Sequence, residues 1–514
     1  MLAKIWTAAL IGVDARPVEV ECDVGSGIPD FSTVGLAELA VKEARVRVRS
    51  AIRHSRLPFP QGRVIVNLAP ADLRKDGTSF DLPVALAVLT ADGCLPVSAL
   101  HDWVAVGELS LNGALRAVCG VLAVAEMAAR MGLRGVICPT DNAAEALAVP
   151  GIEVRWADDL AALVAQLRRE QPWPEGVVAL SALPVRHPLC WSDVRGHEQA
   201  KRALEVAAAG GHNVVLCGTP GTGKTMLARR LPTILPPLQC AEAIEVTKIH
   251  SVAGLLPSRT GLLAERPFRA PHHTASAASL VGGGSIPKPG EVSLAHRGVL
   301  FLDELAEFPR HVLETLRQPL EDGYITVTRA RQTVRFPAQA IVVAALNPCP
   351  CGHHGGVPGR CVCSPFVLER YMSRLSGPLL DRIDIQLRLP ALAGELLRGG
   401  PTGDSSEVVR RRVTAARETQ GARYADLVCA GRVPTNADVP VATLRRLSPL
   451  APPVHDMLLK ALDVFGLSPR AHDRVWRVAR TLADLDESQQ IEAGHIGEAL
   501  QYRWFDRKAL ATAA

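Results

Sequence analysis

The sequence predicts a multidomain α/β protein whose central domain is a doubly wound parallel sheet. The chain has 514 residues, too many for one hydrophobic core, and this length favours about three domains. Residues 213–231 read as a buried strand, a glycine-rich turn and the start of a helix. Two later apolar runs, 298–302 and 340–346, each lead into polar residues. Because such residues at the carboxyl ends of parallel strands face a ligand crevice, the three runs indicate one sheet with one site.

The composition is that of a globular chain, with 48% hydrophobic and 21% charged residues. The net charge of +5 is a weak indication of a polyanionic partner, and the excess of arginine over lysine could reflect genome base composition alone. The first fifteen residues lack the length and cleavage site of a signal peptide. No uncharged apolar run approaches the roughly 20 residues that span a bilayer. We therefore expect a cytoplasmic protein without a membrane partner.

The sequence divides into four regions. Residues 1–170 alternate short strand-like runs with alanine-rich helical runs, which predicts an α+β domain. Residues 171–191 carry four prolines without periodicity, which is typical of a linker. Residues 192–395 contain the predicted parallel sheet, and residues 396–514 are dominated by helical patterns.

Two stretches of the first region, Lys75–Ser79 and Gly107–Gly113, resemble the proteolytic domain of Lon-type proteases. The resemblance puts Ser79 in the place of the nucleophile, and such a serine needs a neighbouring base, which in Lon is a lysine. The corresponding position falls near Leu122, and no lysine follows Lys75 until position 201. We therefore expect a Lon-like, ribosomal-protein-S5-like fold without peptidase activity.

The glycine-rich turn fits the phosphate-loop pattern G-x-x-x-x-G-K-[ST]. It consists of Gly218, Thr219, Pro220, Gly221, Thr222, Gly223, Lys224 and Thr225. Its backbone N–H groups can surround phosphate oxygens, and the helix N-terminus adds positive charge. Lys224 can reach the β- and γ-phosphates, and the Thr225 hydroxyl can bind Mg²⁺. The alternative is a glycine-rich turn that contains a lysine by chance, but the strand before the turn and the helix after it argue against this. We therefore predict a site for ATP and Mg²⁺.

Polar residues follow the two later strands. Asp303 and Glu304 end the first of them, where Asp303 can bind Mg²⁺ and Glu304 can polarise the attacking water as a general base. Asn347 ends the second and could orient that water or contact the γ-phosphate. An asparagine that only caps its strand is the alternative for Asn347. The order of the three features along the chain favours the functional interpretation.

Two wordings carry a family resemblance: Phe268–Ser276, which reads FRAPHHTAS, and Asn347–Gly352, which reads NPCPCG. Together with the phosphate-loop segment and Ser376–Asp384 (SGPLLDRID), they resemble the ComM/YifB family of magnesium-chelatase-like AAA+ ATPases. The resemblance covers nearly the whole chain. The I subunit of magnesium chelatase shares the motor, but the Lon-like first domain favours ComM/YifB.

The resemblance implies an AAA+ core at 192–395, a C-terminal helical lid and a homo-hexameric ring. It also implies roles for three residues. Asn347 would be the sensor-1 residue, Arg382 the finger supplied to a neighbouring subunit, and Arg470 the sensor-2 arginine of the lid. A guanidinium suits a transition state whose charge is spread over the γ-phosphoryl oxygens. For either arginine alone, a surface salt bridge is the alternative.

Two insertions are candidates for holding DNA. The segment between His250 and Arg297 contains Lys288 on a glycine-rich tip, and residues 325–337 read as a hairpin with Arg329 and Arg331 near its tip. Basic tips in a ring could hold a phosphodiester backbone without reading bases. A solvated hairpin end explains the same pattern equally well. The paired histidines 272 and 273 are expected to fix the conformation of the first insertion rather than bind metal.

Four cysteines cluster in the loop after Asn347. Cys349, Cys351, Cys361 and Cys363 could enclose Zn²⁺ tetrahedrally, although their spacing departs from the usual C-x₂-C pairs. Ordinary reduced thiols in a flexible loop are the alternative.

These features favour an ATP-dependent DNA motor. The family resemblance implies a helicase or branch-migration factor in recombination and natural transformation. A protein-remodelling ATPase of the chelatase I-subunit type, with a protein partner, is the second hypothesis. A regulatory or scaffolding role for the first domain is the third.

Overall fold

The computed structural model describes residues 2–35, 39–174, 188–284, 287–329, 332–356, 359–375, 377–391, 403–427 and 434–505. The chain forms two compact units. Unit 1 combines Met1–Pro184 with Glu242–Ala264 and Thr328–Arg335, and unit 2 contains Val185–Ala241, Glu265–Val327 and Phe336–Ala514. The protein is therefore a multidomain, mixed α/β chain, as the sequence predicted. Among the described residues, no helix has both the length and the apolar character needed to cross a membrane.

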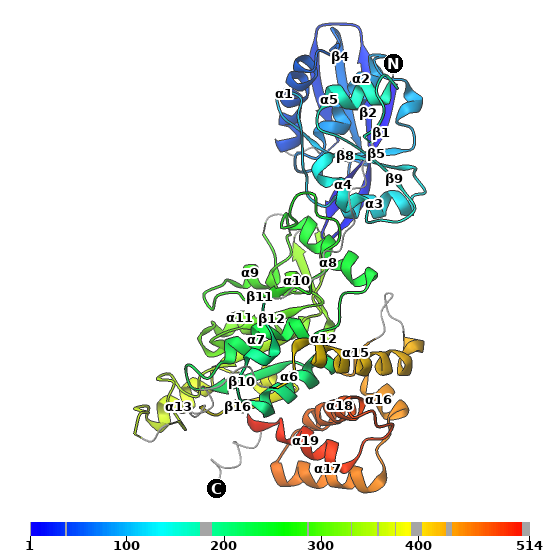
Figure 1. The fold of residues 1–514 in the computed structure, drawn as a ribbon. Coiled ribbons are helices and arrows are strands. Elements are labelled where there is room, and N and C mark those ends of the chain that lie inside the picture. Colours follow the sequence, from blue (N-terminus) through cyan, green and yellow to red (C-terminus); the bar gives the residue numbers. More distant parts are fainter. Residues whose placement is uncertain are drawn as a thin grey trace. The chain divides into compact units, whose positions relative to one another are not determined.

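Unit 1 is built on a seven-stranded sheet of order β3-β4-β2-β1-β5-β8-β9 (Figure 1). Its strands are β1 Leu2–Ile11, β2 Asp14–Gly25, β3 Asp30–Val34, β4 Arg63–Ala69, β5 Trp103–Ala105, β8 Gly135–Pro139 and β9 Glu153–Ala157. Pairing is antiparallel between β1 and β2 and between β2 and β4, and parallel elsewhere. The long strands alternate buried and exposed residues because one face of the sheet packs on a core.

Helices and short elements complete this part of unit 1. They are α1 Leu39–His54, α2 Asp81–Ala91, η1 Val97–Ala99, β6 Glu108–Leu109, β7 Leu115–Arg116, α3 Val121–Arg130, α4 Thr140–Ala146 and α5 Leu160–Leu167. Every residue of α2 is buried, since it packs against β1 and β2 on one side and α1 on the other. A helix without a polar face is typical of a domain centre.

A segment from far along the sequence completes unit 1. Most of α8, Cys240–Val252, belongs to it. The Ser251 hydroxyl donates to the buried carboxylate of Glu145 at 2.6 Å and accepts the backbone N–H of Gly120 at 2.9 Å. Lys248 bridges Asp14 and Glu126 at 2.7 and 2.6 Å. Helix α8 is therefore held by hydrogen bonds and ion pairs to the first domain of the sequence.

The structure shows where Lys75, Ser79 and Leu122, the residues compared with the Lon site, lie. The Lys75 ammonium is buried and donates to the carbonyl oxygens of Gly35, at 3.1 Å, and Pro70. Within the described residues, no lysine or histidine side chain is hydrogen-bonded to Ser79. Leu122, at the position expected for the Lon base, is fully buried in α3.

Unit 2 contains a five-stranded sheet of order β11-β12-β15-β10-β16 in which all pairs are parallel. Its strands are β10 Val214–Gly218, β11 Phe268–Arg269, β12 Val299–Leu302, β15 Ile341–Leu346 and β16 Ile385–Leu389. The strands β10, β12 and β15 are buried along their whole length, which explains their continuous apolar runs. The sequence-based prediction of a central parallel sheet is confirmed.

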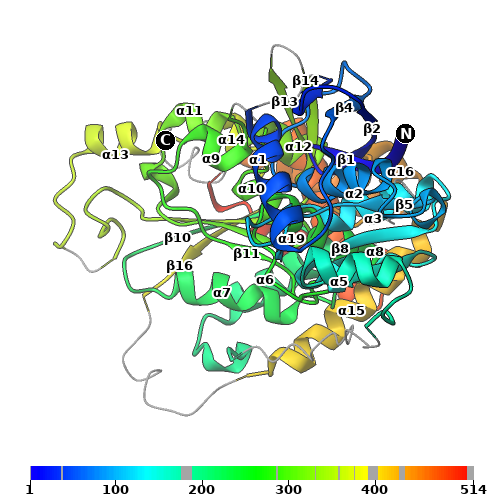
Figure 2. The same ribbon diagram turned by 90° about the horizontal axis from the view of Figure 1, so that it is seen from above.

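Helices pack around this sheet (Figure 2). Helix α7, Lys224–Ile234, packs against β12 and β15, and α6, Glu198–Gly210, packs against β16. The other elements before the C-terminal region are η2 Trp191–Asp193, α9 Ala277–Val281, α10 Glu291–Leu294, η3 Leu305–Glu307, α11 Arg310–Glu314, α12 Arg317–Asp322, α13 Pro365–Met372 and α14 Gly377–Leu380. A two-stranded hairpin, β13 Tyr324–Arg329 and β14 Gln332–Pro337, occurs where the alternating pattern predicted one.

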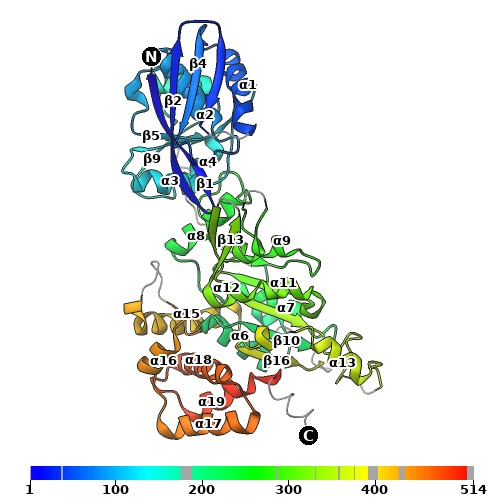
Figure 3. The ribbon, with the colours of Figure 1, turned by 180° about the vertical axis from the view of Figure 1, so that it is seen from behind.

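The C-terminal region of unit 2 is helical (Figure 3). It contains α15 Ser406–Arg423, η5 Ala425–Leu427, α16 Val441–Leu447, α17 Pro452–Phe465, α18 Pro469–Leu485 and α19 Ala493–Gln501. Asp384, directly before β16, accepts hydrogen bonds from Arg474 of α18 at 2.7 Å and from the backbone N–H of Asn213 at 3.3 Å. One buried carboxylate therefore joins the C-terminal helices to the sheet.

Candidate nucleotide site

The phosphate loop connects β10 directly to α7. Gly221 and Gly223 have φ values of 79° and 82°, a left-handed conformation that costs little only for glycine. The Thr222 hydroxyl donates to the carbonyl oxygen of Thr219 at 2.8 Å and closes the turn. The local sequence thus fixes a loop that runs straight into a helix N-terminus, which is the arrangement of an anion site.

Lys224 lies at the centre of this loop. Its Nζ donates to the carbonyl oxygens of Gly218 and Thr219 at 2.6 and 3.1 Å. It also donates to Oδ1 of Asn347 at 3.2 Å, so the end of β15 meets the loop. Burial lowers the pKa of the Lys224 ammonium. A phosphate placed here would compensate for that desolvation, because an opposite charge favours the charged form of the amine.

An oxygen pair lies beside the lysine. The Thr225 hydroxyl donates to Oδ2 of Asp303 at 3.0 Å, which joins the first turn of α7 to the end of β12. Hydroxyl and carboxylate oxygens are the ligands that Mg²⁺ prefers. The other Asp303 oxygen accepts the backbone N–H of Glu304 at 3.0 Å. These two residues therefore form a partial ligand set that fits the magnesium of MgATP.

Glu304 is held by a residue of the FRAPHHTAS segment. Its φ is 53°, a left-handed conformation that is uncommon outside glycine. Its Oε2 lies 3.0 Å from Nδ1 of His273, and the Glu304 side chain is 51% exposed. The ring of His272 lies against that of His273 with centroids 4.1 Å apart, and His272 in turn contacts the Thr274 hydroxyl at 2.8 Å. The paired histidines thus have a contact at the site that the sequence analysis did not foresee.

Comparison with known proteins identifies the family. Models described as magnesium chelatase subunit ChlI, subunit ChlI of Mg-chelatase, and its C-terminal part match residues 190–397, 20–142 and 403–503. The uncharacterised protein YifB of Escherichia coli is 44% identical over 511 residues, and the competence protein ComM of Haemophilus influenzae is 45% identical over 509 residues. These matches cover 98% of this chain and 98% and 97% of the two relatives, respectively. The chain belongs to the ComM/YifB family of magnesium-chelatase-like AAA+ proteins.

Similarity to magnesium chelatase itself is more limited. The 38 kDa subunit of the Rhodobacter capsulatus enzyme is 26% identical over 248 residues, which cover 45% of this chain and 65% of that protein. This chain is therefore more similar to ComM and YifB, over more of its length, than to the chelatase subunit.

In this ComM/YifB protein the cysteine loop borders the phosphate loop. A Cβ added to Gly352 would lie 2.7 Å from Cγ of Pro220, and one added to Gly356 would lie 3.2 Å from Cγ2 of Thr219. The backbone of the cysteine loop therefore contacts the phosphate loop closely. The four sulfurs of the loop lie within 4.8 Å of one another.

The two predicted arginines contact other residues of their own chain. Arg382 is paired with Glu321 and donates to the carbonyl oxygen of Pro378 at 2.6 Å. Arg470 begins α18, is 64% exposed, and lies 3.9 Å from a carboxylate oxygen of Asp381. Neither guanidinium has a hydrogen bond to the phosphate loop within the described part of the chain.

The predicted DNA-contacting residues can be placed only in part. Lys288 is exposed, and its backbone pairs with Gly283. Arg331 and the side chain of Arg329 lie outside the described residues. Nearby on β14, Val334 is buried, and its side chain would meet a Cβ added to Gly12. This part of the hairpin therefore packs within unit 1.

Proposed function

We propose that this protein hydrolyses ATP and uses the energy to move or remodel DNA, as a helicase or branch-migration factor of the ComM type. Two observations support the proposal together: the assembled phosphate-loop site, and a relative named for competence that matches almost the whole chain. Recombination during natural transformation is the process we assign to it, in the cytoplasm.

Each residue of the site has a part in hydrolysis. The phosphate loop and Lys224 bind the β- and γ-phosphates. Thr225 and Asp303 would hold Mg²⁺, which would supply positive charge beside the transferred phosphoryl group. Glu304 takes a proton from the attacking water, and Asn347 orients that water or the γ-phosphate. The hydrogen bond between Lys224 and Asn347 keeps these groups together before the nucleotide binds.

Hydrolysis at this site requires a second subunit. Arg382 is tied to Glu321 of its own chain and has no hydrogen bond to its own phosphate loop within the described residues. We assign it to the site of the neighbouring subunit in a homo-hexameric ring, with Arg470 acting from the lid. Arg382→Ala should retain ATP binding but lose turnover, whereas a monomer that hydrolyses ATP at full rate would contradict this assignment.

DNA-stimulated ATP hydrolysis tests the proposal directly. We expect single-stranded or forked DNA to raise the turnover of the full-length protein. Glu304→Gln should bind ATP with unchanged affinity and fail to hydrolyse it, which makes it the control for contaminating ATPases. Stimulation by a protein partner but by no form of DNA would favour the remodelling function of the chelatase type, to which the family models give some weight.

The sulfur positions of the cysteine loop support a second proposal, a zinc site. Its sulfur–sulfur separations include 3.3 Å for Cys349 and Cys351, 3.9 Å for Cys349 and Cys361, and 3.7 Å for Cys351 and Cys361. Four thiolates at about 2.3 Å from a zinc ion lie about 3.8 Å apart in a tetrahedron. Backbone N–H groups of His353 and Val362 lower the pKa of the Cys351 thiol to about 6, whereas the pKa of the Cys361 thiol is raised and that of Cys363 is raised to about 11.

We assign this cluster to structural Zn²⁺, with Cys363 as the fourth ligand. Protein purified without a histidine tag should contain about one zinc per chain. The double variant Cys351→Ser/Cys361→Ser should lose it, and Cys240→Ser, an exposed cysteine elsewhere, should keep it. A metal-free protein with four titratable thiols in this loop would show that they are ordinary cysteines.

Peptidase activity is not part of the proposed function. Lys75 is engaged by backbone carbonyls, and Leu122 replaces the expected base. Serine-dependent cleavage of casein by the full-length protein would contradict this.

A further inference from the structure

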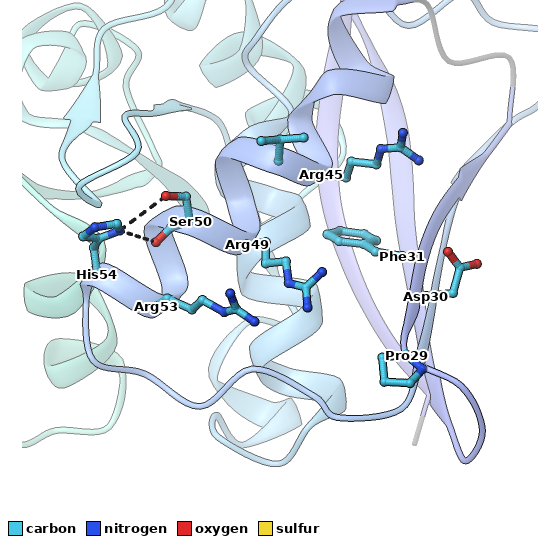
Figure 4. A pocket seen from close by; sticks show the side chains of 9 residues that line it. Pro29, Asp30, Phe31, Arg45, Arg49, Ser50, Arg53 and His54 are labelled. Atoms are coloured by element: carbon cyan, nitrogen blue, oxygen red, sulfur yellow. Dashed lines mark hydrogen bonds between the residues drawn. The ribbon is translucent and has the colours of Figure 1, made fainter.

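A hollow of about 500 Å³ lies in unit 1, between α1 and the start of β3 (Figure 4). One side is formed by Pro29, Asp30 and Phe31, and the other by Arg45, Val46, Arg49, Ser50, Arg53 and His54. None of these residues belongs to the nucleotide site. The hollow is open to solvent, and its α1 side carries three arginines.

Arg45, Arg49 and Arg53 form a row along one face of α1, which we call the arginine row. Residues four apart on a helix lie above one another, about 6 Å apart along the axis. All three are exposed. Within the described part of the chain, no carboxylate pairs with any of them. Arg47 of the same helix, by contrast, forms a bidentate ion pair with Asp81, with hydrogen bonds of 2.7 and 2.9 Å.

Ser50 and His54 of the hollow already have hydrogen-bond partners. His54 Nδ1 lies 3.0 Å from the Ser50 carbonyl oxygen and 3.3 Å from its hydroxyl, and that hydroxyl donates to the Leu111 carbonyl at 3.2 Å. These contacts turn His54 back onto its own helix. The arginine row therefore supplies the unused hydrogen-bond donors, and Asp30 on the opposite wall is the one carboxylate among the lining residues.

Apolar surface lies next to the row. Val46 is 63% exposed, and Phe31 packs beside Phe59 with ring centroids 6.1 Å apart. The guanidinium of Arg49 lies 5.3 Å from the centroid of the Phe59 ring, a cation–π contact that restrains its side chain. The hollow thus combines a restrained cation, two further cations and an apolar floor.

We propose that the arginine row binds the phosphodiester backbone of single-stranded DNA. Three cations spread over about 12 Å suit a linear polyanion better than one small anion. Arginine pairs well with phosphate oxygens, and the exposed valine can contact bases or sugars as the strand passes. No base edge is read by such contacts, so binding should be independent of sequence. The inference rests on the proposed DNA motor and adds a contact surface outside the ATPase unit.

The test compares two triple variants of the full-length protein that remove the same charge. Arg45→Ala/Arg49→Ala/Arg53→Ala removes the row. Arg16→Ala/Arg116→Ala/Arg130→Ala removes three exposed arginines elsewhere in unit 1. Alanine favours helix, so the row variant should fold. Binding of labelled oligo(dT) is measured by fluorescence anisotropy over a salt series without ATP.

The row variant should bind oligo(dT) at least about tenfold more weakly than wild type. The slope of log affinity against log salt should fall by about 2, because each phosphate contact on a single strand contributes about 0.7. The control variant should keep the wild-type slope. Basal ATP hydrolysis should be unchanged in both variants, since neither alters the nucleotide site.

The outcomes separate this inference from the proposed function. Equal slopes in the row and control variants, with DNA still stimulating ATP hydrolysis, would overturn the arginine row and leave the motor. The row variant could show the smaller salt slope while no form of DNA stimulates ATP hydrolysis by the wild-type protein. That result would support DNA binding by the arginine row and overturn the proposed DNA motor. Row-dependent binding of poly-glutamate with unchanged binding of oligo(dT) would make an acidic protein segment the occupant and overturn the inference.

Discussion

Replacing His273 by alanine tests how Glu304, the proposed general base, is held. The His273 ring nitrogen lies 3.0 Å from a Glu304 oxygen, and the two side chains are 30% and 51% exposed. Solvent screening at this exposure limits such a pair to about 1 kcal/mol. Since about 1.4 kcal/mol corresponds to tenfold in rate, we expect kcat to fall by at most roughly 5-fold. Removal of Glu304 itself should cost about 10² to 10⁴, because the general base is then lost.

The measurement is steady-state ATP hydrolysis at saturating DNA. The KM for ATP should stay unchanged in His273→Ala, because the histidine positions the base and does not contact the phosphate loop. His273→Asn should recover part of kcat, since an amide can still donate to the carboxylate. His272→Ala is the matched control and should affect kcat less. An unchanged or increased kcat in His273→Ala would show that the contact does not position Glu304 for catalysis.

Two further variants probe buried carboxylates. Asp384→Asn should lower the free energy of unfolding of unit 2 by about 3 kcal/mol in urea denaturation, because it leaves Arg474 without its charge partner. Burial alone would raise the pKa of the Asp384 carboxyl, but the neighbouring Arg474 guanidinium holds that pKa well below its usual value. The contribution of the Asp384 carboxylate to the free energy of unfolding should therefore be complete above about pH 4 and be lost as the pH falls further. The asparagine variant should lack this pH dependence. Ser251→Ala should destabilise unit 1 by about 1–3 kcal/mol in thermal unfolding, because buried Glu145 loses a donor, while the exposed Ser258→Ala should have little effect.

The sequence predicts the parts of the fold that depend on local pattern. The strand–loop–helix at Lys224 and the strand before Asp303 can be predicted from the sequence. Hydrophobic periodicity and the positions of the glycines specify both within a few residues of the chain. The same is true of the hairpin at 324–337. The contact between Thr225 and Asp303 follows once both strands are assigned to one parallel sheet.

Other features depend on contacts that periodicity does not encode. Helix α8 has an ordinary helical pattern, and nothing in it indicates that Ser251 meets Glu145 of a distant domain. The contact of His273 with Glu304 requires β11 to pair beside β12, and β11 has only two residues. The ion pair of Arg382 with Glu321 joins two polar surface residues, a class of contact that charge patterns do not determine. The sequence does not predict the arginine row, because Val46–Ile52 alternates apolar and polar residues in the pattern of a strand. That prediction is wrong, since the segment lies in α1.

Unit 1 contains three separate stretches of the chain, and this affects how the protein can be made. The ribosome releases Met1–Pro184 long before Glu242–Ala264 and Thr328–Arg335. Until α8 emerges, Glu145 has no hydroxyl donor from Ser251 and the N–H of Gly120 has no acceptor. The first domain of the sequence therefore completes its folding only after most of the ATPase sheet has been synthesised. A nascent or truncated chain that stops at residue 184 would lack these contacts and would be an unfinished domain.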